Sequence, residues 1–215
     1  KELLDQMIAC NTAIAQEGMH GDYGANIGKV IAIRKDLPSL LKAYAAAGSD
    51  ARMNGCELPV VINSGSGNQG LTVSVPLIIY AEREHLDKEK LYRALVISNL
   101  TAIHLKTEIG RLSAFCGAVS AGAACGAGLA YLKDASEEVM NHTIVNALAI
   151  TSGIICDGAK ASCAAKIAVS VEAGILGYDM YMNGQQFYGG DGIISKGIEN
   201  TIHNIGVLGS QGMAF

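Results

Sequence analysis

The sequence contains no tryptophan and only three phenylalanines among its 215 residues. A core so poor in aromatic side chains must be filled by Ala, Val, Ile and Leu, and the 26 glycines allow backbones to approach one another closely. Positive charge is also scarce, because the formal net charge is −4. The sequence therefore offers no basic surface of the kind that binds nucleic acid, and nucleic acid is not expected among its partners.

A disulfide framework and a secretory signal are both missing. The six cysteines show no regular spacing, and no signal-peptide pattern precedes them. Both features indicate a reducing compartment, so we expect a cytoplasmic location.

One uncharged stretch, Ala114–Leu132, is long enough to meet the length criterion for a membrane-spanning helix. It consists mostly of Ala, Gly, Ser and Cys, which are only weakly hydrophobic. A helix buried on all sides of a water-soluble core is the better interpretation, and no membrane association is expected.

Helical periodicity dominates the chain. It predicts a mainly α-helical, multi-helix bundle with buried Gly/Ala-rich central helices and at most a short strand at Leu58–Asn63. The 215 residues are expected to form a single domain. Because the first residues already show an amphipathic helical pattern, we expect the sequence to be one part of a longer enzyme. The expected helices are Lys1–Glu17, Ala25–Ala47, about 69–83, Asp87–Ile109, Ser113–Leu132, Ser136–Ile155, Ala159–Leu176 and Asp191–Val207.

Three cysteines, Cys116, Cys156 and Cys163, lie in Gly/Ala-rich apolar segments. Three thiolates can hold an iron-sulfur cluster and leave one iron open to a substrate. Buried free cysteines also occur as small hydrophobes, and the spacing matches neither a zinc motif nor a compact ferredoxin motif. The pattern alone leaves both interpretations open, with Cys10, Cys56 and Cys125 as ordinary core or surface thiols.

The spacing of Cys156 and Cys163 carries a structural prediction. Seven residues of continuous helix would separate them by about 10.5 Å along the axis, which is too far for ligands of one cluster. We therefore expect a break at Asp157–Gly158, where glycine tolerates unusual backbone angles and Asp157 can cap a helix that begins near Ala159.

A polar, glycine-rich loop follows the strand candidate and precedes a helix. It comprises Asn63, Ser64, Gly65, Ser66, Gly67, Asn68 and Gln69. Exposed backbone N–H groups and a helix N-terminus suit such a loop to binding a carboxylate, although Gly and Ser also form simple flexible connections. It lacks the Lys-Ser/Thr pair of a phosphate-binding loop.

Three segments of the sequence resemble segments of a known protein family. INSGSGNQG at Ile62–Gly70, FCGA around Cys116 and IICDGAKASC at Ile154–Cys163 resemble the iron-sulfur L-serine dehydratase alpha-chain group, and more closely the related L-cysteine desulfidase family. The resemblance extends over nearly the whole chain. It implies that Cys116, Cys156 and Cys163 hold a 4Fe-4S cluster, and that residues 63–69 bind a small amino-acid substrate.

The resemblance also implies the reaction and a partner. An open iron would act as a Lewis acid while a base removes the α-proton, and loss of the β-substituent would leave aminoacrylate, which hydrolyses to pyruvate and ammonia. The family chain is about twice as long, and its proposed catalytic cysteine has no counterpart here. We therefore expect a missing N-terminal domain or a companion chain to supply the base, and homo-oligomerisation stays open.

Several choices are left open by the sequence. L-cysteine and L-serine are both possible substrates, and a non-catalytic iron-sulfur sensor is the alternative to an enzyme. His104, Lys106 and Glu108 are expected at the surface or boundary of their helix. His142 and Asn146 either line the site or form a hydrogen-bonded core pair, and Lys160 either offsets cluster charge or is solvated.

Overall fold

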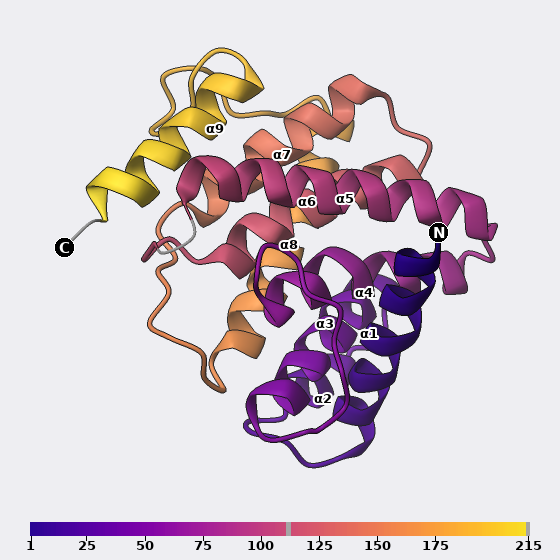
Figure 1. The fold of residues 1–215 in the computed structure, drawn as a ribbon. Coiled ribbons are helices and arrows are strands. Elements are labelled where there is room, and N and C mark those ends of the chain that lie inside the picture. The colour runs from indigo at the N-terminus through magenta and orange to yellow at the C-terminus, as the bar shows by residue number, and fades with distance from the viewer. Residues whose placement is uncertain (111–112, 214–215) are drawn as a thin grey trace.

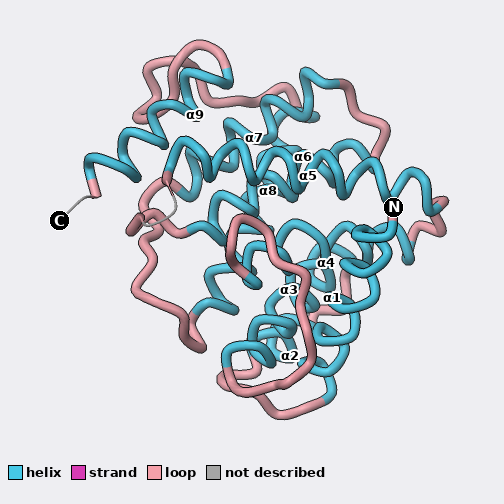
Figure 2. The backbone as a smooth tube through the Cα atoms, in the orientation of Figure 1, coloured by secondary structure: helices cyan, strands magenta, loops and turns pink. Residues whose placement is uncertain are grey.

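The computed structural model describes residues 1–110 and 113–213, and this part of the chain folds into helices without a β-sheet. Figure 2 shows only helix and loop along the traced backbone. The predicted all-helical class is thus confirmed. The described helices are α1 (Glu2–His20), α2 (Ile27–Ala32), α3 (Leu37–Met53), α4 (Gly67–Arg83), α5 (Lys88–Ile109), α6 (Gly117–Leu132), α7 (Glu137–Thr151), α8 (Cys163–Met182), α9 (Ile198–Val207) and the π-helical turn η1 (Leu208–Gly212).

The helices surround α6. This helix packs against α4, α5, α7 and α8, while α3 packs against α1, α2, α4 and α8. Figure 1 shows α1 to α3 gathered at one end of the molecule and α9 at the opposite end. The weakly hydrophobic stretch predicted to be a core helix is therefore the central one.

Close helix packing at the centre depends on glycine. A Cβ placed on Gly122 would lie 2.4 Å from the carbonyl oxygen of Ser170, and one placed on Gly174 would lie 2.6 Å from that of Gly122. Backbone atoms of α6 and α8 thus touch directly, which only a residue without a side chain permits. No helix in the described parts of the chain combines the length and apolarity needed to cross a membrane.

The helix expected at Ser136–Ile155 is not almost fully buried, as a central helix would be. Residues 143–148 in the middle of α7 are buried, but Ile150 is exposed, and so is Ile155 beyond the end of α7. Helices α6, α8 and α9 pack against α7, and they leave part of its surface uncovered.

Two expected elements also differ. Leu58–Asn63 pairs with no other strand in the described residues, where the two bridges are the isolated pairs Asn63 with Ser66 and Phe115 with Ile155. The expected helix Ala25–Ala47 is divided into α2 and α3 because Lys35 takes a positive φ of 60°. A new helix then begins at the next residue, where Asp36 accepts a hydrogen bond from the backbone N–H of Ser39.

Three further helices begin later than expected. The helix expected from Ser113 begins at Gly117, and the one expected from Asp191 begins at Ile198. The helix expected from Ala159 begins at Cys163. As a result, Cys116 and Cys163 both lie at the start of a helix.

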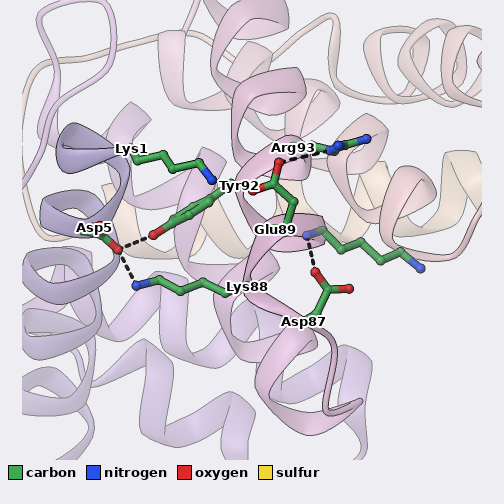
Figure 3. A network of polar contacts seen from close by, with 8 residues as sticks. Lys1, Asp5, Asp87, Lys88, Glu89, Tyr92 and Arg93 are labelled. Carbon is green, nitrogen blue, oxygen red and sulfur yellow. Dashed lines mark hydrogen bonds and ion pairs between the residues drawn. The ribbon is translucent and has the colours of Figure 1, made fainter.

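A polar network ties the start of α1 to the start of α5 (Figure 3). The Asp5 carboxylate accepts hydrogen bonds from the Tyr92 hydroxyl and the Lys88 ammonium, and Lys1 pairs with Glu89. These contacts hold the pKa of Asp5 below its usual value. The ion pairs of this network are largely solvent-exposed, so they contribute little to the stability of the fold.

Candidate functional site

The predicted substrate loop begins as a tight turn. Asn63 and Ser66 exchange backbone hydrogen bonds of 3.1 and 2.9 Å, and the two residues between them, Ser64 and Gly65, have positive φ values of 49° and 80°. Two consecutive positive φ values are the pattern of a type I′ turn, which favours glycine at the second position. Ser66 then caps α4 by accepting a hydrogen bond from the Gln69 N–H.

Asn11 on α1 holds the segment that leads into this turn. It is fully buried, and its Oδ1 accepts a 2.8 Å hydrogen bond from the Val61 N–H. Its Nδ2 donates to the Val61 and Gly70 carbonyls and to the Ser74 hydroxyl. One side chain therefore joins α1, the extended segment and the first turns of α4, and fixes where the loop can lie.

Replacing Asn11 by leucine is expected to destabilise the protein by about 2–4 kcal/mol, because the buried Val61 and Gly70 carbonyls lose a donor and the Val61 N–H loses its acceptor. Chemical denaturation measures the change. Asn54→Ala, which removes one partly buried hydrogen bond to the Asp50 carbonyl outside the loop, is the control and should cost about 1 kcal/mol. Equal losses in the two variants would contradict the role given to Asn11.

The loop residues point in different directions. The Asn63 amide donates to Asn99 on α5, and the side-chain oxygen Oδ1 of Asn68 accepts from Ser49 and Arg52 on α3. Ser64 and Gly65 instead line a cavity of about 830 Å³. Asn63 and Asn68 thus hold the loop in place, whereas its tip faces open space.

Gln69 brings the loop to the cysteine region. Its side chain is 4% exposed, and its Oε1 has no hydrogen-bond partner among the described residues. Its amide group lies directly over Gly117, where an added Cβ would come within 2.5 Å of Nε2. Because Gly117 follows Cys116, the first turn of α4 packs beside the residue that carries the first thiol.

The three cysteines come from neighbouring segments. The Cys156 N–H donates a 2.6 Å hydrogen bond to the Ala114 carbonyl, and the Cys116 N–H donates to the Ile154 carbonyl. Cys163 begins α8, and its thiol lies 3.7 Å from the Gly158 carbonyl oxygen. Backbone hydrogen bonds therefore join the Cys116 and Cys156 segments, and the Cys163 thiol contacts the loop that follows Cys156. No disulfide links any of the six cysteines.

The helix break expected between Cys156 and Cys163 is present. Residues 152–162 lie outside helices, and Gly158 has a φ of +100°. The expected cap is wrong: Asp157 does not cap α8, whose first residue is preceded by Ser162. Instead, the Asp157 carboxylate accepts a hydrogen bond from Lys166 one turn into α8, and Lys166 also donates to the Ile155 carbonyl.

The thiols do not form a closed ligand set in this structure. Cys116 and Cys163 are buried and Cys156 is exposed, and no three His, Cys, Asp or Glu side chains in residues 1–110 and 113–213 gather around one point as metal ligands. The kind of donor nevertheless suits iron, because thiolates are the ligands of iron-sulfur clusters. The three cysteines thus fit a cluster in the chemistry of their donors, while the positions of their side chains in the described residues do not gather as a ligand set.

Opposing effects act on the pKa of the Cys116 thiol. Burial raises the pKa of this thiol, while the Val119 and Ala118 N–H groups at the start of α6 lower it. The Cys156 thiol nearby raises the pKa further, and the Lys166 ammonium lowers it. A cation and a helix N-terminus thus accompany the thiols, as an anionic ligand set requires.

The surface or boundary position expected for Lys106 is wrong. His104 and Glu108 are exposed, as expected, and approach Glu199 and His203 of α9. Lys106 is only 9% exposed and lines the same cavity as Ser64 and Gly65. Burial lowers its pKa, and the Cys156 and Cys116 thiols act in the opposite direction. The helical phase offered a signal, because Lys106 lies four residues after Ala102 and three before Ile109, both in the core.

The other sequence candidates lie elsewhere. Asn146 donates a hydrogen bond to the Gly177 carbonyl and accepts one from the Phe187 N–H. Its role is therefore structural, within the core. His142 stacks on Tyr181 with ring centroids 4.2 Å apart and lines a separate cavity of about 760 Å³. Lys160 is exposed and pairs with Asp157.

Comparison with known proteins shows which family the sequence matches. The model of the family described as "Serine dehydratase alpha chain" matches residues 1–215. A UPF0597 protein of Desulfitobacterium hafniense is 64% identical over 99% of this chain and 50% of its own length. UPF0597 proteins of Finegoldia magna and Lachnoclostridium phytofermentans are 52% and 53% identical, with 51% and 52% of their lengths covered. The chain spans about half the length of these relatives, and no solved structure matches it.

Proposed function

The chain belongs to the serine dehydratase alpha chain family, and from this premise we propose that it carries the iron-binding part of a lyase that eliminates the β-substituent of a small L-amino acid. L-cysteine is the proposed substrate, giving pyruvate, ammonia and sulfide. The contact of Gln69 with Gly117 is the observation that carries the proposal, because it joins the polar loop to the thiol region.

Cys116, Cys156 and Cys163 are the residues proposed to hold a 4Fe-4S cluster. When bound, a cluster with one open iron supplies Lewis acidity toward the carboxylate or the leaving group of the substrate. Lys166 supports this arrangement, because its hydrogen bonds to Ile155 and Asp157 fasten the Cys156 segment to α8. The loop tip at Ser64 and Gly65 then orients the substrate through backbone N–H groups and the Ser64 hydroxyl.

The proposed elimination reaction proceeds in three steps. A base takes the α-proton, and the electron pair left on Cα forms the Cα=Cβ double bond as the Cβ–S bond breaks. The departing sulfur takes a proton and leaves as sulfide. Water then hydrolyses the tautomerised aminoacrylate to pyruvate and ammonia. We propose that the base belongs to the part of the longer relatives that this chain does not cover.

Product analysis of the anaerobically reconstituted full-length protein tests the proposal. With L-cysteine, pyruvate and sulfide are expected in equal amounts. With L-serine, pyruvate should form at a lower kcat/KM. Faster turnover of L-serine would assign the dehydratase reaction instead, and a cluster-loaded protein that converts neither amino acid would favour a sensor.

A further inference from the structure

Lys106 is a largely buried lysine that lines a cavity. No hydrogen bond or ion pair joins its Nζ to another described residue in the range 1–110 or 113–213. Lysine is almost never this deeply buried unless it is paired, since removing an ammonium from water costs several kcal/mol. An anion that enters from outside the chain would offset this cost.

The position of Lys106 narrows the choice of anion. The side chain lines the same cavity as the tight turn at Ser64 and Gly65, where backbone N–H groups of positive-φ residues can also bind an anion. The cavity, at about 830 Å³, is wide enough to admit a small molecule with its water.

A second lysine, Lys166, lies near the thiols. Lys166 is close enough to Cys116 and Cys163 for their charges to raise its pKa, and it is tied to the Cys156 segment. Lys166 is thus the cation that hydrogen bonds tie to the thiol region. The Cys156 and Cys116 thiols also act on the pKa of Lys106, but Lys106 has no hydrogen bond to that region among the described residues and lines the same cavity as Ser64 and Gly65. Lys106 is therefore the cation available to an anion inside this cavity.

We propose that Lys106 binds the α-carboxylate of the amino-acid substrate, opposite the Ser64–Gly65 turn. This inference rests on the proposed function, which supplies the substrate class. It adds the residue that recognises the carboxylate and explains why a lysine is buried in α5. It also predicts that ligands without a carboxylate bind weakly.

Titration calorimetry with two unreactive probes tests the proposal on the full-length reconstituted protein. L-alanine has the carboxylate and ammonium groups but no leaving group, and L-alaninamide lacks the carboxylate charge. The unaltered protein should prefer L-alanine. Lys106→Met should weaken L-alanine binding by about 10–100-fold, the usual value of a charge-assisted hydrogen bond, and leave L-alaninamide binding unchanged. Lys106→Arg should retain part of the preference.

Iron content and circular dichroism accompany each titration. Lys106→Met that keeps its iron, its fold and its full preference for L-alanine would overturn the proposal. A second outcome would also overturn the proposal. If Lys106→Met lost its iron, while Lys106→Arg kept its iron and the full preference for L-alanine, Lys106 would be assigned to the cluster. An unaltered protein that converts L-cysteine but does not distinguish the probes would refute the carboxylate role alone. One that binds no amino acid would refute the proposed function itself.

Discussion

Gly174→Val is expected to destabilise the protein by about 3–5 kcal/mol, at the upper end of what single substitutions cost. A Cβ at this position would lie 2.6 Å from the Gly122 carbonyl oxygen and 3.0 Å from the Gly126 Cα. Both neighbours are backbone atoms, so no rotamer change relieves the overlap, and α8 must move away from α6. Chemical denaturation measures the loss.

Gly153→Ala is the matched control. No atom lies within 4 Å of a Cβ added there, so its free energy of unfolding should change by no more than about 0.5 kcal/mol. If Gly174→Val were as stable as Gly153→Ala, the close crossing of α6 and α8 would be incorrect.

Replacing Cys116, Cys156 or Cys163 by alanine, one at a time, is expected to remove most of the bound iron and to abolish the elimination reaction. Loss of a group that merely supports a metal ligand lowers affinity or activity about 10–100-fold, and loss of a ligand should exceed this. The fold should survive at Cys156, which is exposed. Iron analysis and the pyruvate assay on anaerobically reconstituted protein measure both effects.

Cys10→Ala provides the comparison, because Cys10 is a half-buried free thiol on α1 outside the three cysteine segments. Its iron content and rate should match those of the unaltered protein. Retention of full iron by any of the three alanine variants would show that the missing thiol is not a ligand.

Local patterns predicted the helices where their signals were strong. The uncharged Gly/Ala stretch predicted the central helix α6. The helix expected to begin at Ser136 does so, because the Ser136 hydroxyl caps α7 by accepting a hydrogen bond from the Val139 N–H. The break between Cys156 and Cys163 followed from helix geometry and Gly158. The division of α2 from α3 was missed because the apolar pattern continues across it, although Asp36 and Pro38 mark the start of α3.

The site was less accessible to prediction because long-range contacts create it. Asn11 bonds to Val61 across 50 residues, and neither residue carries a local sign of that contact. The Cys116 and Cys156 segments adjoin through backbone hydrogen bonds that no spacing encodes. The burial of Lys106 depends on which helices cover α5, so its helical phase indicated the core side without indicating a cavity.

A crystal structure of the anaerobically reconstituted full-length protein, with iron located by anomalous scattering, tests the central claim most directly. We expect one cluster bound by the Sγ atoms of Cys116, Cys156 and Cys163, with its remaining iron facing the cavity that Ser64 and Lys106 line. Iron bound by other residues, or three thiols that stay apart in a protein active on L-cysteine, would contradict it.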